Sequence, residues 1–515
     1  MPRPDPAQAI APGHYRTDVA VIGAGVAGLF TAVKLPRDLD VVIVDKGTGG
    51  SSGSSPWAQG GMAAAMGEDD SADHHAADTI AASDGLTDPS AVAVLTREAP
   101  TRIRELIELG ARFDTQDGHL HLAREGGQHV ARSVHRADAT GAEMVRVLRD
   151  AAAPRVTRLA GTAFELARDR DRVTGVWVLG GDGDPVLLEA RAVLLATGGC
   201  GGLFAATTNP DHATGDGVAL AWLAGAAVRD LEFVQFHPTG LAVSGSWRFL
   251  LTEALRGAGA TLHDDAGERF MATVHPDAEL APRHVVSKAL LGVGTGYLDA
   301  THLGEDRLRE EFPTVLEGVA EHGFDLATER VPVTPAAHYM IGGVRTDLRA
   351  RTSVTGLYAA GEVASTGVHG ANRMAGNSLS EALVFGARAA DAIVSDLPEP
   401  PATTPDAPNL PSSSVDTPGL RRRLRATMWN GAGPVRDATR LERTITDLGA
   451  LAAELGGAAA SPEHLELSLA AVTARLIATS ALLRTESRGG HWREDHPTSD
   501  DAWNAVHLER IRPAT

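Results

Sequence analysis

The stretch "TDVAVIGAGVAGLFTAVKL" (residues 17–35) has the pattern of a buried strand, a glycine turn and a helix, and "LDVVIVDKG" (39–47) supplies a second strand. Between the first strand and the helix, Gly23, Gly25 and Gly28 have the G-x-G-x-x-G spacing, and Asp45 ends the second strand about 20 residues further on. A strand, a helix and an acid in this register predict a Rossmann-type, dinucleotide-binding βαβ unit.

Each residue of this fingerprint has a physical reason. We expect Gly23 to make the tight turn, Gly25 to let the backbone approach a pyrophosphate, and Gly28 to allow close packing of helix on strand. The helix N-terminus adds partial positive charge, and Asp45 would accept hydrogen bonds from the adenosine ribose. A plain tight turn in any doubly wound fold is the simpler alternative, and the fingerprint does not distinguish FAD from NAD.

Two further strand patterns appear much later, at "RAVLLATGG" (191–199) and "TGLYAAGE" (355–362), and a helix pattern follows at 378–397. One sheet is therefore expected to be assembled from distant segments, with another domain inserted between them. Residues 398–418 are rich in Pro, Ser and Thr, which predicts a linker. The predicted fold class is α/β, in these parts: a nucleotide-binding domain over 14–230 and 346–397, an inserted α+β capping domain over 231–345, a linker over 398–418, and a C-terminal helical bundle over 419–515.

Composition excludes several classes of function. The chain has 515 residues, so more than one core is expected, and its formal net charge of −19 argues against nucleic acid or an anionic membrane surface as a partner. Its single cysteine, Cys200, excludes an intrachain disulfide and a Cys-ligated metal cluster, and no metal site is predicted. The N-terminus has no apolar signal region, and the apolar run 217–228 is shorter than the ~20 residues of a membrane span. We expect a cytoplasmic protein.

Several longer motifs resemble the succinate dehydrogenase/fumarate reductase flavoprotein family, from about residue 17 to the C-terminus. These motifs are "SSGSSPWAQGGMAAAM" (51–66), "LATGG" (195–199), "TTNPDHATGDGVALAWLAGA" (207–226), "YAAGEVASTGVHGANRMAGNSLSEALVFG" (358–386) and "ESRGGHWREDHP" (486–497). Within the family, the resemblance is greatest to the members that oxidise L-aspartate. It implies that the nucleotide-binding domain holds FAD.

By this resemblance, the residues that contact FAD, together with the fingerprint glycines, are Gly23, Ala24, Gly25, Val26, Ala27, Gly28, Asp45, Lys46, Ser54, Ser55, Pro56, Trp57, Ala58, Gln59, Gly60, Gly61, Asp216, Glu362, Ser378 and Leu379. Members of the family in membrane complexes attach FAD covalently through a histidine five residues before the glutamine of AQGG. Here that position is Ser54. A serine cannot form the histidyl–flavin bond, so the resemblance implies noncovalent FAD.

The resemblance also implies that His237, Thr252, His338 and Arg373 hold the two carboxylates of a C4 dicarboxylic acid. Guanidinium groups bind carboxylates in a bidentate manner, and histidines add hydrogen bonds, so the residue types suit this ligand. Taken singly, each has a simpler interpretation, because a histidine beside a proline is often a turn residue and a lone arginine is usually a surface cation.

In the same family the counterpart of Arg283 is the general acid/base of dicarboxylate chemistry, relayed through a Glu-x-x-Arg pair that matches Glu253 and Arg256. An ordinary guanidinium has a pKa above about 12 and is a poor base. Two roles for Arg283 therefore stay open, proton transfer and charge stabilisation.

"LAREGGQHVAR" (122–132) has two glycines and no apolar periodicity, which predicts a loop, and it places Glu125 among cations. A pocket for succinate or fumarate needs only cations, whereas the ammonium of an amino acid needs a carboxylate partner. "HLAREGG" resembles the loop in which the aspartate-oxidising members recognise the amino group, so Glu125 is implied to bind it. The simpler alternative is a surface glutamate paired with Arg124.

The implied reaction is FAD-dependent oxidation of L-aspartate to iminoaspartate, with O2 or fumarate as electron acceptor. This is the first step of NAD biosynthesis from aspartate, and quinolinate synthase would then take the imine. Three alternatives remain open: a soluble fumarate reductase or succinate-oxidising flavoprotein, the flavoprotein subunit of a membrane respiratory complex, and a non-catalytic FAD-binding scaffold.

Overall fold

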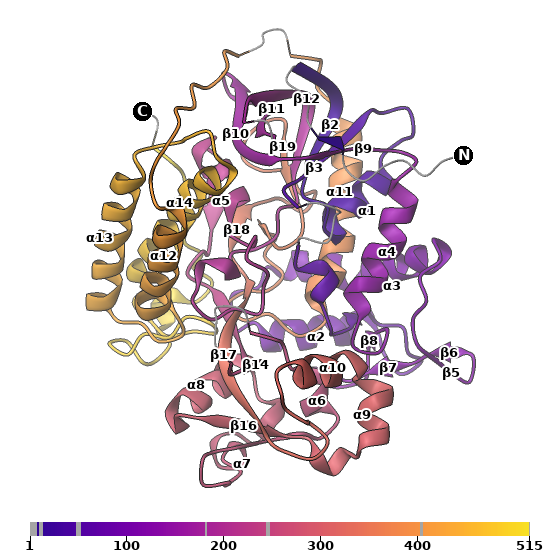
Figure 1. Ribbon diagram of the computed structural model, residues 1–515. Helices are drawn as coiled ribbons and strands as arrows, with labels where there is room; N and C mark the ends of the chain where they lie inside the picture. The colour runs from indigo at the N-terminus through magenta and orange to yellow at the C-terminus, as the bar shows by residue number, and fades with distance from the viewer. Residues whose placement is uncertain are drawn as a thin grey trace.

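The computed structural model describes residues 8–9, 14–47, 53–180, 183–243, 248–401 and 405–513, and a central eight-stranded sheet organises the fold (Figure 1). The strand order is β1-β9-β3-β2-β12-β11-β10, and β19 pairs with the end of β12. The strands are β1 (Gln8–Ala9), β2 (His14–Ile22), β3 (Val41–Asp45), β9 (Thr157–Ala160), β10 (Thr162–Asp169), β11 (Arg172–Leu179), β12 (Pro185–Leu195) and β19 (Leu357–Ala359). The assembly of one sheet from distant segments is thereby confirmed.

The two faces of this sheet are distinguished by the alternation of side chains along its strands. Val19 and Val21 pack on one face, with Val41 and Ile43 of the neighbouring strand. The residues between them, Ala20 and Ile22 on β2 and Val42 and Val44 on β3, pack on the other face. Because helices cover both faces, residues 19–22 and 41–44 of these strands are continuously apolar rather than alternating.

The first face is covered by α1 (Val26–Lys34), α3 (Pro89–Glu108), α4 (Thr140–Ala152) and α11 (Asn377–Asp396). The predicted helix at 378–397 is α11. It packs closely on α1, where the hydroxyl of Thr31 donates a hydrogen bond of 2.9 Å to the carbonyl of Gly386. A further helix, α2 (Ala72–Ala82), packs against α3.

The second face is covered by α5 (Asp216–Leu223) and the C-terminal helices α12 (Thr417–Ala432), α13 (Ala438–Leu455) and α14 (Pro462–Leu483). The predicted helical bundle is present, and its apolar residues are continuous with those under the sheet. The domain boundaries themselves remain predictions.

The helix α14 lies in the region for which a helical bundle was predicted. This helix is long and apolar enough to cross a membrane, with a mean hydropathy of 1.4 over its most apolar window, but 72% of that window is buried inside the protein. It is the core helix of the C-terminal bundle.

The inserted region forms a second, antiparallel sheet with its own apolar core, below the central sheet in Figure 1. Its strands and helices are β14 (Val234–Leu241), β15 (Thr261–His263), β16 (Gly296–Asp299), β17 (Val331–Met340), α6 (Glu253–Gly257), α7 (Met271–Val274), α8 (Arg283–Val293), α9 (Glu305–Glu311) and α10 (Pro313–Glu321). Buried Asp138 joins it to the rest of the chain, because its carboxylate accepts hydrogen bonds from the first backbone amides of α10, Thr314 (3.1 Å) and Val315 (2.7 Å).

Short strands complete the fold. They are β4 (Met62–Ala63), β5 (Thr115–Gln116), β6 (His119–Leu120), β7 (Leu122–Ala123), β8 (Ser133–Val134), β13 (Val228–Arg229), β18 (Gly343–Arg345), β20 (Ala364–Ser365) and β21 (Glu509–Arg510). The predicted loop 122–132 therefore begins with two residues of a strand, β7, because Leu122 and Ala123 pair with β8. The remainder is irregular, as expected.

Candidate active site

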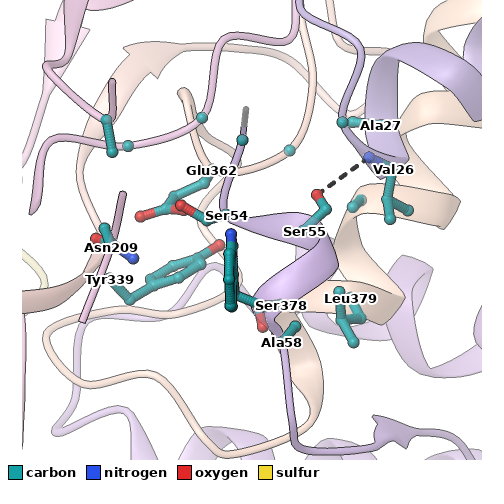
Figure 2. A pocket seen from close by; sticks show the side chains of 18 of the residues that line it. Val26, Ala27, Ser54, Ser55, Ala58, Asn209, Tyr339, Glu362, Ser378 and Leu379 are labelled. Atoms are coloured by element: carbon teal, nitrogen blue, oxygen red, sulfur yellow. Dashed lines mark hydrogen bonds between the residues drawn. The ribbon is translucent and has the colours of Figure 1, made fainter. Parts of the chain in front are cut away.

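One continuous pocket runs from the N-terminus of α1 to the sheet of the capping region. Figure 2 shows one part of it, with Val26, Ala27 and Leu379 on one side, and Asn209, Tyr339 and Glu362 on the other. The predicted FAD residues line this pocket with the exception of Gly28. Of the predicted substrate and catalytic residues, Arg256 does not line it.

The glycine turn has the geometry that the fingerprint requires. Gly23 has a φ of +109°, and a Cβ there would lie 2.3 Å from the carbonyl oxygen of Ala196. A Cβ at Gly28 would lie 2.2 Å from the carbonyl oxygen of Gly23, so Gly28 sets the close packing of α1 behind the turn. Neither position accepts a side chain. The close packing of the turn places the N-terminus of α1 in the lining of the pocket.

The polar groups around this end of the pocket suit FAD. The backbone N–H of Val26, at the start of α1, donates 3.2 Å to the Ser55 hydroxyl (Figure 2). Among the described residues, Gln59 Oε1, Thr197 Oγ1 and Asn209 Oδ1 line the pocket as buried polar atoms with no hydrogen-bond partner. A pocket with a helix N-terminus at one end and unpaired polar atoms in its lining fits a ligand rich in phosphate, hydroxyl and ring nitrogen groups.

Lys46 lies at the end of β3 and is held by carboxylates from two other parts of the chain. Its ammonium lies 3.0 Å from Asp216 on α5 and 2.6 Å from Glu466 on α14. Burial disfavours the charged form, but these two carboxylates raise the pKa of Lys46 above its ordinary value. Lys46 and Asp216 were predicted as FAD contacts, whereas Glu466, which lies on a distant helix and in no motif, was not predicted.

The other end of the pocket gathers the predicted dicarboxylate residues. His237, Thr252, Glu253, Arg283, His338 and Arg373 all line it. They come from β14, the start of α6, the start of α8, β17 and the segment before α11. The structure thus brings together residues that are up to 136 positions apart in the sequence.

Gln235 on β14 holds the two arginines of this site side by side. Its side-chain oxygen accepts hydrogen bonds from Arg283 Nη1 (2.9 Å) and Arg373 Nη2 (3.1 Å). Its amide nitrogen donates to Asn372 Oδ1 (3.1 Å) and the carbonyl of Arg373 (2.9 Å). Sequence reasoning missed Gln235, although it stands two residues before His237 in the same motif.

The histidines of the site are kept neutral. Burial, followed by the charge of Arg283, lowers the pKa of both His237 and His338 well below the ordinary value. The backbone N–H of Thr239 donates to Nδ1 of His237 (3.2 Å), so the proton of that neutral ring lies on Nε2. His237 is therefore a hydrogen-bond donor through Nε2, as binding of a carboxylate requires.

Arg373 is buried and stacked. Burial and the neighbouring Arg283 lower the pKa of Arg373 to about 10. Its guanidinium lies 4.6 Å over the ring of Tyr339 and donates to the Ser378 hydroxyl (3.1 Å). Tyr339 and the pocket-lining Thr208, Asn209 and His212 were not predicted individually, although the last three lie in a motif that carried the resemblance.

Arg283, Glu253 and Arg256 form the predicted series. Arg283 Nε donates to Glu253 Oε2 at 2.5 Å, and Arg256 Nη2 lies 3.8 Å from the same oxygen. Burial alone would raise the pKa of Glu253, but the two arginines outweigh it and lower that pKa. Arg256 lies behind Glu253 and continues the series away from the pocket, where its Nη1 donates to the carbonyl of Glu279.

Glu125 is a buried residue of the pocket, 5% exposed. Its Oε1 accepts a hydrogen bond of 2.9 Å from the backbone N–H of Gly61. Burial, with a contribution from Glu253, raises its pKa. A Cβ at Gly126 would lie 2.0 Å from Glu253 Oε1, so this glycine allows the loop to approach α6.

The alternative interpretation of Glu125 as the surface partner of Arg124 is wrong. Arg124 is exposed and its Nε donates to the carbonyl of Gln128 (2.8 Å). Arg132, the fully buried cation of the same loop, pairs with Asp78 (2.7 Å) and Asp70 (3.3 Å). Arg124 and Arg132 thus have partners other than Glu125, which lines the pocket instead.

A metal ion has no evident place here: over the described ranges, no group of three or more His, Cys, Asp or Glu side chains could hold one. The polar groups of the pocket match a dicarboxylate and a flavin nucleotide.

Comparisons with known proteins agree with this geometry. Residues 18–379 match the family model described as FAD binding domain, and residues 421–511 match the one described as fumarate reductase flavoprotein C-term. An L-aspartate oxidase of Streptomyces coelicolor is 45% identical over alignments that cover 99% of this chain and 93% of that one. An L-aspartate oxidase of Caulobacter vibrioides is 46% identical, with 93% of each chain covered.

Among solved structures, a quinol fumarate reductase of E. coli superposes with a TM-score of 0.89 at 30% identity, covering 98% of this chain and 95% of that one. The fold is thus that of the predicted flavoproteins, and FAD is the cofactor of the nucleotide-binding domain. The chain belongs to the L-aspartate oxidase family, within the succinate dehydrogenase/fumarate reductase flavoproteins.

Proposed function

We propose that this chain catalyses the FAD-dependent oxidation of L-aspartate to iminoaspartate, with the substrate held in the pocket described above. The observation that carries the proposal is Glu125, a buried carboxylate that lines the pocket beside Arg283, Arg373 and two histidines. The other carboxylate at this end, Glu253, is paired with Arg283, whereas Glu125 accepts only a backbone N–H among the hydrogen bonds described above. A buried carboxylate facing the binding site of a dianion is unfavourable unless the ligand also carries a cation. The ammonium group of an α-amino acid supplies one.

In this proposal Arg373, His237, His338 and Thr252 bind the two carboxylates of aspartate. The Nε2–H of His237 and the guanidinium of Arg373 donate charge-assisted hydrogen bonds. Glu125 accepts from the ammonium group and thereby selects which face of Cα is presented to the cofactor. Because the site residues come from both the central fold and the capping region, their closure around the substrate also excludes water.

When bound, FAD supplies the acceptor for the hydride that leaves Cα. The residues proposed to hold it are those at the start of α1, the segment Ser54–Gly61, and Asp45, Lys46, Asp216, Glu362, Ser378 and Leu379. We propose that FAD is noncovalent, because Ser54 occupies the position of the attaching histidine. Flavin released into the supernatant by acid precipitation would support this, and flavin retained in the pellet would contradict it.

Arg283 is proposed as the catalytic residue, and Glu253 with the buried Arg256 continues its contacts away from the pocket. Its bond of 2.5 Å to Glu253 provides a route for a proton, and its positive charge stabilises negative charge on the substrate in either role.

The wider setting is also a proposal. Electrons would leave to O2 or to fumarate, since fumarate has the two carboxylates for which the clamp is built. Iminoaspartate hydrolyses readily, so a transient hand-off to quinolinate synthase in the cytoplasm would protect it. In that setting the reaction is the first step of NAD biosynthesis from aspartate.

The test is anaerobic mixing of the purified protein with L-aspartate and, separately, with succinate, while the flavin absorbance is followed. Bleaching by aspartate alone is the expected result. Bleaching by succinate alone would instead assign the alternative function, a succinate-oxidising or fumarate-reducing flavoprotein. Bleaching by neither, with FAD bound, would overturn both.

A further inference from the structure

The segment Arg488–Trp492, called here the C-terminal turn, belongs to a motif for which the proposed reaction has no use. It follows α14 and closes on itself, because the backbone N–H of Arg488 donates to the carbonyl of His491 (2.8 Å) and that of His491 donates to the carbonyl of Arg488 (2.9 Å). In Figure 1 the chain after α14 (yellow) passes from the helical bundle toward β14 and β17.

The C-terminal turn packs against the segment that carries Arg373. The backbone N–H of Gly490 donates to the carbonyl of Ala371 (3.0 Å), and a Cβ at Gly489 would lie 2.2 Å from the same oxygen. Gly489 has a φ of +50° and also donates to Asp84 Oδ2 (2.7 Å). The turn thus contacts the backbone of Ala371, two residues before Arg373 in the sequence.

The turn also packs against β14, the strand that carries Gln235 and His237. A Cβ at Gly490 would lie 2.8 Å from the carbonyl oxygen of Val234 and 3.7 Å from the Cα of Gln235. Since Gln235 bonds both Arg283 and Arg373, a shift of β14 at this point would be transmitted to both arginines.

The third contact is with α8, which begins at Arg283. The ammonium of Lys288 on this helix lies 4.2 Å above the ring of Trp492. A buried arginine holds the turn: Arg436 Nη1 donates to Nδ1 of His491 and to the carbonyl of Glu232, both at 2.7 Å. The side chain of Glu232 is itself paired with Arg484, whose Nε lies 2.6 Å from Glu232 Oε1.

We propose that the C-terminal turn is a positioning element of the dicarboxylate site, because it contacts all three segments that carry His237, Arg283 and Arg373. The proposal rests on the proposed function only for the identity of the ligand. It assigns the last part of the chain a role in binding carboxylates, in addition to its role in the fold. Gly490 is its most informative residue, since its φ is not positive and only space excludes a side chain.

The test is Gly490→Ala, with Gly449→Ala as the matched control, because Gly449 lies on α13 in the same helical bundle and a Cβ there meets nothing within 4 Å. For Gly490→Ala we expect the KM for L-aspartate and the Kd of succinate, from anaerobic titration of the flavin spectrum, to rise together by about 10- to 100-fold, as for a small misplacement of binding groups. The FAD content and the FAD dissociation constant should stay as in the wild type.

Unchanged succinate and aspartate binding in Gly490→Ala would overturn the inference. If that variant does not fold, Lys288→Met decides, because it removes only the surface contact with Trp492: a rise of about 2- to 5-fold in the succinate Kd supports the inference, given the ~0.5–1 kcal/mol of such a contact, and no rise overturns it. A wild-type protein that binds succinate but is not reduced by aspartate would refute the proposed function and leave this test intact.

Discussion

Replacing Glu125 with glutamine removes the charge proposed to bind the substrate ammonium and leaves the shape of the side chain. The amide oxygen of glutamine can still accept the hydrogen bond of 2.9 Å from Gly61, so the loop should keep its position. Removing one partner of a buried charge pair costs about 2–5 kcal/mol. A central value of about 3 kcal/mol corresponds to a loss of roughly 100-fold in kcat/KM for L-aspartate.

Two further measurements separate this role from a structural one. The Kd of succinate should be unchanged or lower in Glu125→Gln, because a carboxylate that repels a dianion is gone. Since burial raises the pKa of Glu125 in the folded protein, its charged form destabilises the fold. Stability from the protonated form is present at acid pH and is lost as the pH rises through the raised pKa. Glu125→Gln should therefore unfold at a higher temperature than the wild type at neutral pH, with the difference vanishing at acid pH.

The matched control is Arg124→Gln, which changes the charge of the exposed neighbour and should leave kcat/KM within about twofold, as for exposed ion pairs. The reasoning is refuted if Glu125→Gln weakens aspartate and succinate equally, or if Arg124→Gln reproduces its loss. Either result would mean that Glu125 acts through the loop and does not contact the substrate.

Four other outcomes follow from the contacts described. Protonation of Glu125 should make kcat/KM for aspartate fall as the pH is lowered, with a midpoint above the ordinary pKa of glutamate because burial raises the pKa of Glu125. A midpoint at the ordinary glutamate pKa would contradict this. Gly126→Ala places a Cβ 2.0 Å from Glu253 Oε1 and should lower kcat by about 100-fold with FAD retained. An active variant would show that catalysis does not require Glu253 in its present position. Asp138→Ala removes the acceptor for the first amides of α10, at a cost of about 0.5–2 kcal/mol, and should speed proteolysis within the capping region. Arg132→Met removes the buried guanidinium that pairs with Asp70 and Asp78 and, among the described residues, leaves Asp78 only its contacts with His129. It should cost about 3–5 kcal/mol in urea unfolding, whereas a change below about 1 kcal/mol would contradict the ion pairs.

The elements of the central sheet were predictable because their signals are local. The spacing of Gly23 and Gly28 reflects a contact within one turn, and residues 41–44 of β3 are all apolar because both faces of the strand are covered. The strand β7 at the start of loop 122–132 and the burial of α14 were not predicted, because pairing partners and burial are not visible in a window of sequence.

The candidate site divides in the same way. His237, Thr252, Arg283, His338 and Arg373 could be named from motifs, since each stands in a recognisable stretch. Gln235 and Glu466 could not be assigned, because their importance lies in contacts with Arg373 and Lys46, 138 and 420 positions away.

By itself, the sequence determined the class of the protein, since a strand–turn–helix with three glycines and an acid leaves little freedom for another local structure or ligand type. Only the tertiary structure decided what Glu125 faces. A glutamate beside an arginine is compatible with a surface pair or a binding site, and the choice depends on burial, which the packing of loop 122–132 against Gly61 and α6 provides. The same holds for the C-terminal turn, whose contacts with β14, Ala371 and α8 exist only once the whole chain has folded.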